Sequence, residues 1–213
     1  PSIQNKGGHA VSITTYDGLK TSIANWLNRD DLVAVIPTFV SLAEAHISRE
    51  LRHWKQEKRV TTSLDERYEN LPNDWLEIKL ITLTSGKMLK TISAGDMSER
   101  RAQSNAAGEP KFVRLSADQI EIYPTPNAPT DVNLLYYARV PSLSDASPTN
   151  WLLSDAPDIL LYGSLIHSAP YLADDARTQV WASLYQNGLD KLNAENAKGQ
   201  QHAGPLNMGV PRQ

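Results

Sequence analysis

The sequence of 213 residues contains no cysteine, which excludes a disulfide framework, a thiolate metal site and a cysteine nucleophile. It also lacks an excess of basic charge, since the net charge is −3, so no global field attracts nucleic acid. No apolar run approaches the roughly 20 residues that span a bilayer. The segment PSIQNKGGHAVSITTY has no apolar core, and we expect no cleaved secretion signal. These absences predict a soluble protein that is made in a reducing compartment, long enough for one sizeable core or two small ones.

Two amphipathic helices are predicted near the start of the chain. Thr14-Thr15-Tyr16-Asp17 has the spacing of a capping box, with Asp in place of the usual Glu. Apolar residues follow at helical spacing through Leu27. A second, longer helix begins at Pro37, because proline is tolerated only in the first turn. Its apolar stripe comprises Ile36, Val40, Ala43, Ile47, Leu51 and Trp54.

From Lys58 to Pro141 the apolar period changes from about 3.6 residues to 2. Ile120 and Ile122 flank Glu121, for example, and Ser116-Ala117-Asp118 predicts a hairpin turn between residues 112–115 and 119–123. Prolines punctuate these runs at Pro72, Pro110, Pro124, Pro126, Pro129 and Pro141. We expect an antiparallel β region with one face exposed to water.

The pattern becomes helical again in the last third of the chain. Asp155 and Pro157 predict the start of a helix that ends at Pro170, and its residues 159–166 are apolar on most sides. Asp174 predicts the cap of a last helix. The stripe of that helix comprises Val180, Trp181, Leu184, Tyr185, Gly188, Leu189 and Leu192.

Both helical zones have an unpaired apolar face, and packing them together is the economical solution. We therefore predict an α+β fold: a helical bundle formed by N- and C-terminal helices, with an inserted antiparallel β-rich domain and an extended C-terminal arm. The expected ranges are 1–13 for an N-terminal extension, 14–57 and 151–198 for the two halves of the bundle, 58–150 for the β-rich domain and 199–213 for the arm.

The sequence offers two weak candidates for chemistry. His46, Glu50 and His53 share a helical spacing that could hold a metal, but Arg49 and Arg52 would repel a cation, so we interpret these residues as a solvated helix face. Ser164 and His167 lack the second glycine of a nucleophile elbow and do not follow a strand. A hydrogen-bonded core histidine is the favoured role of His167. We expect no catalysis, no metal and no cofactor.

A basic cluster is predicted near the end of the long helix. It comprises Arg49, Arg52, Lys55, Lys58 and Arg59. Two roles are open. A basic patch can contact nucleic acid, although Glu50 and Glu57 dilute this one, and an intersubunit contact is equally compatible with it.

The segment from Gly199 to Gln213 is rich in glycine, proline and polar residues, which argues against regular structure. Leu206, Met208 and Val210 alternate, as in an extended segment that adds to a partner's sheet edge or lies in a groove. Fully extended, it reaches on the order of 50 Å. We interpret it as a docking arm.

Several phrases, in this order, resemble a family of phage adaptor proteins and cover roughly residues 14 to 208. They are TTYDGLK from Thr14, WLNRDDL from Trp26, IPTF from Ile36, LAE from Leu42, LPNDWLE from Leu71, IYPTP from Ile122, YYA from Tyr136, TNWLL from Thr149, APD from Ala156, APYL from Ala169 and GPL from Gly204. Pro1 to Ser12 departs from that family, whose members often begin near the Thr-Thr-Tyr phrase.

The resemblance implies a head-to-tail connector, akin to the tail tubular adaptors of short-tailed phages. Such subunits, usually twelve, form a ring beneath the portal that receives the tail or nozzle protein below, and DNA passes through the channel without sequence-specific binding. The implied location is the virion neck, after assembly in the host cytoplasm. The expected portal-binding residues are Gly204, Pro205, Leu206, Asn207, Met208 and Val210. The alternative is a DNA-contacting packaging or head-completion protein that uses the basic cluster near Arg52.

Overall fold

The computed structural model describes residues 12–172 and 176–201, with only the backbone of residues 30 and 197–201. The chain divides into two compact units. We call residues 1–53 with 140–213 the helical unit and Trp54–Arg139 the β unit. Helices and antiparallel strands together confirm the predicted α+β class.

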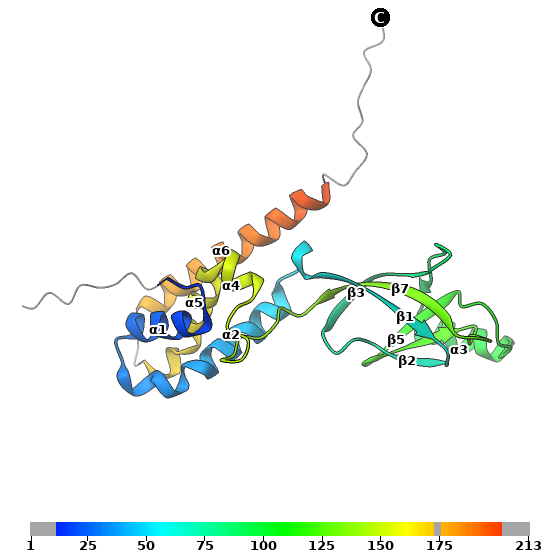
Figure 1. Cartoon of the computed structure of the whole chain (residues 1–213), viewed down its shortest axis with the longest axis horizontal. Helices are drawn as coiled ribbons and strands as arrows, with labels where there is room; N and C mark the ends of the chain where they lie inside the picture. Colours follow the sequence, from blue (N-terminus) through cyan, green and yellow to red (C-terminus); the bar gives the residue numbers. More distant parts are fainter. Residues whose placement is uncertain (1–11, 173–175, 202–213) are drawn as a thin grey trace, which may run out of the picture. The chain divides into compact units, whose positions relative to one another are not determined.

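Helix α5 lies at the centre of the helical unit, where it contacts α1, α2 and α6 (Figure 1). Its residues Ile159, Leu160 and Leu165 are fully buried, as the apolar run predicted. The elements of this unit are α1 (Tyr16–Leu27), η1 (Asp30–Val35), α2 (Ile36–Glu50), α4 (Trp151–Asp155), α5 (Pro157–His167), η3 (Ala169–Tyr171) and α6 (Arg177–Gln201).

The helix ends differ from the sequence-based expectations in three places. The N-cap of α1 is Thr15, whose side chain accepts from the Gly18 amide, and not Thr14. Helix α2 ends at Glu50 because Leu51 is extended, so Trp54 belongs to the β unit and is exposed. Asp155 is the last residue of α4, and α5 starts after Ala156 without a side-chain cap. The expected cap Asp174 lies outside the described residues.

The stripe predicted for the last helix is divided between two faces of α6. Trp181, Tyr185 and Leu189 are buried in the core that α6 shares with α1, α2 and α5. Val180 and Leu184 are instead 57% and 38% exposed. The helix also continues to Gln201, so the first residues of the arm expected from residue 199 are helical.

The segment Asp31–Glu50 is long and apolar enough, by length and composition alone, to cross a membrane. We did not expect such a segment from the sequence. Core helices pass the same test, and Phe39, Val40 and Ile47 of α2 are buried against the neighbouring helices. Packing inside the helical unit buries 33% of this apolar window and accounts for part of its apolar character.

The β unit contains two sheets. Strand β7 is the centre of the first, with order β1-β7-β3, and all its pairings are antiparallel. The second has the order β2-β6-β5-β4, in which β4 is an edge strand that pairs in parallel with β5. The strands are β1 (Glu57–Leu64), β2 (Tyr68–Asn70), β3 (Trp75–Leu83), β4 (Lys90–Thr91), β5 (Phe112–Ser116), β6 (Gln119–Tyr123) and β7 (Thr130–Ala138).

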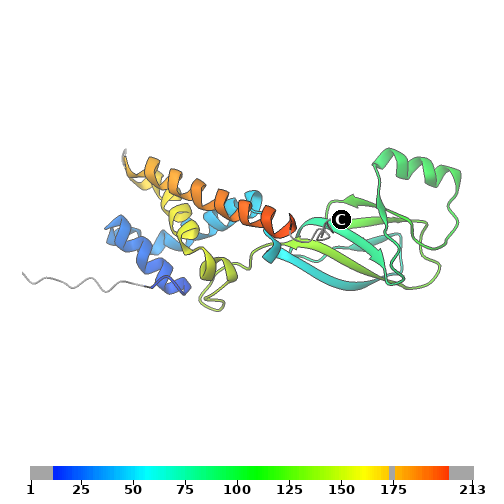
Figure 2. The ribbon, with the colours of Figure 1, turned by 90° about the horizontal axis from the view of Figure 1, so that it is seen from above.

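The hairpin predicted at Ser116-Ala117-Asp118 is confirmed, since β5 and β6 pair antiparallel up to Ser116 and Gln119. Helix α3 (Ala94–Gln103) interrupts the strands and was not predicted. Ser93 caps its first turn by accepting from the Asp96 amide, and Met97 is buried beneath it. Figure 2 shows α3 (green) beside the strands of the β unit.

Candidate functional site

The predicted portal-binding residues fall outside the part of the chain that the structure describes. Gly204, Pro205, Leu206, Asn207, Met208 and Val210 all follow Gln201, the last described residue. Their role stays a prediction.

The predicted basic cluster is divided between the two units. Arg49 and Arg52 belong to the helical unit, whereas Lys55, Lys58 and Arg59 belong to the β unit. Arg52 Nη1 donates to the carbonyls of Ser48 (3.1 Å) and Leu51 (2.8 Å), so it satisfies carbonyl groups at the end of α2. In the β unit, Lys58 Nζ lies 2.8 Å from Asp74 Oδ2. Lys55 Nζ lies 5.5 Å from the centroid of the Trp54 ring. Arg52, Lys55 and Lys58 thus have structural partners.

The three residues considered for a metal do not share one surface. His46 Nε2 lies 3.1 Å from Glu50 Oε1 on α2. His53 follows the helix end, is buried and stacks on Trp151 at 5.4 Å between ring centroids. The interpretation as a solvated face was therefore wrong for His53. No group that could hold a metal ion occurs among the described residues.

Ser164 and His167 do not form a catalytic pair. Ser164 is buried, and its Oγ donates to the Leu160 carbonyl at 2.7 Å. His167 is half-buried, and its Nε2 is buried without a hydrogen-bond partner. The expectation of a hydrogen-bonded core histidine was thus wrong for this atom.

His167 is part of a polar group between three helices. The His46 ring lies 6.0 Å from His167 and 5.5 Å from Tyr185, measured between centroids. Burial lowers the pKa of His167, and the charges of His46 and Arg49 lower it further. Burial also raises the pKa of Tyr185 to about 12. His167 and Tyr185 are therefore uncharged at neutral pH, which suits helix packing better than proton transfer.

Exposed apolar side chains are the more telling feature of the helical unit. Val180 and Leu184 lie one turn apart on the exposed side of α6, and we call this pair the outer face of α6. Other large apolar residues exposed on the helical unit are Trp26, Val33, Leu42 and Tyr171. Single exposed apolar residues are normal, whereas neighbouring ones such as Val180 and Leu184 are compatible with a protein contact.

Sequence reasoning missed a basic hollow in the β unit. Lys87, Met88 and Lys90 line one side of it, and residues 110–112 line the other. The only local sign was that lysines adjoin apolar residues in both KMLK and PKF. The parallel pairing of β4 with β5 brings these distant segments together.

Comparison with known proteins gives one finding. A protein-family model described as SU10 adaptor protein matches residues 14–209. The match starts at the Thr14-Thr15-Tyr16 phrase and spans nearly the whole chain, and it confirms the adaptor resemblance noted in the sequence. No curated protein matches the chain.

Proposed function

The chain belongs to the SU10 adaptor protein family, a family of phage head-to-tail adaptors, and on that premise we propose that it forms a ring beneath the portal and connects it to the tail. The family is structural and is not an enzyme family. The ring is a dodecamer with a central channel for the genome, and the partners are the portal protein and the tail or nozzle protein.

The family match carries this proposal, and the outer face of α6 supports it. Helix α6 buries Trp181 and Tyr185 on its inner side while Val180 and Leu184 remain exposed. A helix that is apolar on two sides needs two contacts. The second contact of α6 is a neighbouring subunit of the ring.

The portal contact is assigned to the segment that follows α6. Gly204 to Met208 match the arm of the family, and a short extended segment can add to a sheet edge or lie in a groove. The main anchor of the arm on the portal is one of Leu206, Met208 and Val210.

Deleting residues 202–213 tests the portal contact, because this deletion keeps all of α6 to Gln201. The full chain mixed with purified portal is expected to give a ring-on-portal complex in electron micrographs. The truncated chain is expected to keep its helical circular dichroism and to lose the complex. If the complex survives the deletion intact, the arm is not the portal contact. If the full chain stays monomeric in the presence of portal, the ring proposal is wrong.

The second candidate, a DNA-contacting packaging or head-completion protein, depends on the basic cluster. Arg52, Lys55 and Lys58 already have structural partners, which leaves less of the cluster for phosphates. Salt-dependent binding of duplex DNA that disappears on changing Arg49, Arg52 and Lys55 to glutamine would favour this candidate over the ring.

A further inference from the structure

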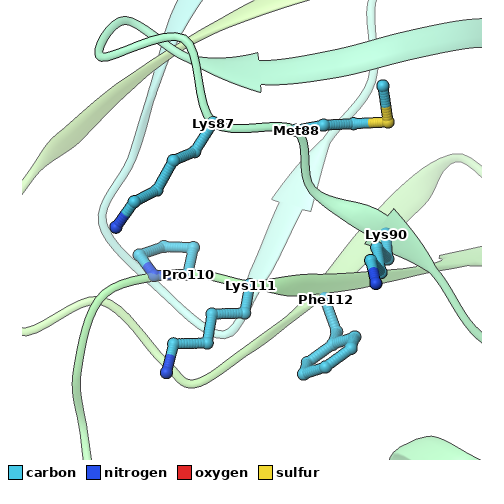
Figure 3. A pocket seen from close by; sticks show the side chains of 6 residues that line it. All are labelled: Lys87, Met88, Lys90, Pro110, Lys111 and Phe112. Carbon is cyan, nitrogen blue, oxygen red and sulfur yellow. The ribbon is translucent and has the colours of Figure 1, made fainter.

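The basic hollow in the β unit has features of a binding site that the adaptor function does not explain. Its volume is ≈ 320 Å³, at the small end of the range for ligand pockets. This size suits one or two side chains of a partner better than a large ligand. Figure 3 shows residues 87–90 and 110–112 running side by side, with the side chains of Lys87 and Lys111 extending toward the same side.

The floor of the hollow is apolar and is held in place. Pro110 is buried, Phe112 is half-buried, and the Arg100 guanidinium lies 4.0 Å from the centroid of the Phe112 ring. Met88 is different, because 63% of its surface is exposed. Methionine is a flexible side chain that adapts to apolar partners, so Met88 can close over an inserted apolar group.

The rim of the hollow carries uncompensated positive charge. Lys87 Nζ lies 2.9 and 2.7 Å from the two carboxylate oxygens of Glu109. Within the ranges that the structure describes, Lys90 and Lys111 have no ion-pair partner. Both side chains are exposed, so the rim attracts a ligand that brings at least two negative charges.

The hollow also adjoins the edge of a sheet. Lys90 belongs to the edge strand β4, whose backbone is held to β5 by the bonds from the Lys90 amide to the Lys111 carbonyl and from the Ile92 amide to the Val113 carbonyl. Lysines on an edge strand discourage pairing with another copy of the same edge. The same lysines do not repel an acidic segment.

We propose that this hollow docks an acidic, extended segment of another protein, which inserts one apolar side chain between Met88 and Phe112 and places carboxylates beside Lys90 and Lys111. Nucleic acid fits the hollow less well than an acidic peptide segment does. Single strands bind by stacking bases on aromatic faces, whereas Arg100 already occupies a face of Phe112. The proposal goes beyond the ring and the portal arm, since it gives the β unit a partner chemistry of its own.

The test is a fluorescence anisotropy titration of the full chain with a labelled peptide, Ser-Asp-Glu-Leu-Glu-Asp-Ser, at low salt. The double variant Lys90→Glu with Lys111→Glu is expected to weaken binding by about tenfold or more. Replacing the leucine of the peptide by serine, or Met88 by serine, should each weaken binding several-fold. Circular dichroism confirms that each variant folds.

The matched control is Arg139→Glu with Lys191→Glu, which changes the net charge by the same amount at exposed positions outside the hollow and outside the basic cluster. It should leave the affinity within about twofold. An equal loss in the control, or no loss from the leucine replacement, would overturn the proposal. Tighter binding of a short duplex or single-stranded DNA that Lys90→Glu with Lys111→Glu abolishes would overturn it in favour of nucleic acid. None of these outcomes bears on the portal arm.

Discussion

Arg101 Nε donates to Glu121 Oε1 at 3.2 Å, and this bond ties helix α3 to strand β6. Arg67 and Arg114 approach the same carboxylate at 2.6 and 3.1 Å. Glu121 is only 3% exposed and Arg101 only 9%. Burial alone would raise the pKa of Glu121, but the hydrogen bonds from the three arginines outweigh it and hold that pKa below its ordinary value. The carboxylate is therefore charged in the fold and organises one end of the β unit.

Glu121→Gln is expected to destabilise the β unit by about 3 kcal/mol or more, because it leaves the nearly buried Arg101 without its counter-charge. Urea unfolding, monitored by the circular dichroism of the β strands, measures this loss in the free energy of unfolding. Glu99→Gln, on the exposed side of α3, is the matched control and should change stability by less than about 0.5 kcal/mol. Equal stability of the two variants would show that the network contributes little.

This network also shows where sequence patterns stop being informative. The alternation at Ile120 and Ile122 predicted strand β6 correctly, but it placed Glu121 on a water-exposed face, whereas the structure buries it. Arg67, one of the three arginines that neutralise Glu121, lies 54 positions away in the sequence. A local period cannot report such partners, because they depend on which strands pair.

Two further elements show the same division between local and tertiary information. The turn at Ala117, whose φ is 52°, was predictable because two strand-like runs flank it closely. The end of α2 was not predictable in this way. The apolar spacing continues through Leu51 to Trp54, but the backbone becomes extended at Leu51. The basic hollow was missed for a related reason, since Lys90 and Lys111 meet only through a parallel pairing.

Gly163 is a close-packing position that constrains the helical unit. A Cβ at this residue would lie 3.2 Å from the Ala43 Cβ and 3.2 Å from the Tyr185 Cε2. Gly163→Val is therefore expected to cost about 1–3 kcal/mol by overpacking, despite the gain in helix propensity over glycine.

Thermal unfolding of the full chain, monitored at the helical signal, measures the effect of Gly163→Val. The same substitution at Gly95 is the control, because the nearest atom to a Cβ there is the Ser93 Oγ at 3.8 Å. A lowered melting temperature for both variants would point to β-branching rather than to crowding at Gly163.

The outer face of α6 gives a prediction about assembly that leaves the fold intact. Val180→Asp with Leu184→Asp places two charges on exposed positions and should abolish ring formation, because a desolvated carboxylate at a subunit contact is unfavourable. Ala182→Asp with Asn187→Asp adds the same charges at other exposed positions of α6. Native mass spectrometry with portal should show rings for this control and for the unaltered chain. Rings formed by the first variant would exclude this face from the contact.

His167 predicts how the stability of the helical unit depends on pH. Its folded pKa lies below the ordinary value of 6.5, because of burial and then of His46 and Arg49; Glu50 and Tyr185 are the other titratable groups of this polar group. A histidine with a lowered pKa binds its proton more readily in the unfolded state. Stability is therefore complete above the unfolded pKa of 6.5 and falls as the pH drops from there to the folded pKa, with no further loss below it.

His167→Gln should remove this dependence, because glutamine does not titrate. The loss in the unaltered chain amounts to about 1.4 kcal/mol for each tenfold difference in proton affinity between the two states. The urea midpoints of both chains are measured from about pH 7.5 to 5 at the helical signal. The slope of midpoint against pH is then compared, which does not depend on the absolute stability of the variant. Parallel slopes would mean that His167 is not the responsible group. The expected result is that stability falls less toward low pH in the variant than in the unaltered chain. Burial raises the pKa of Glu44 in the same unit, so Glu44 adds stability as the pH falls, but it does so equally in both chains.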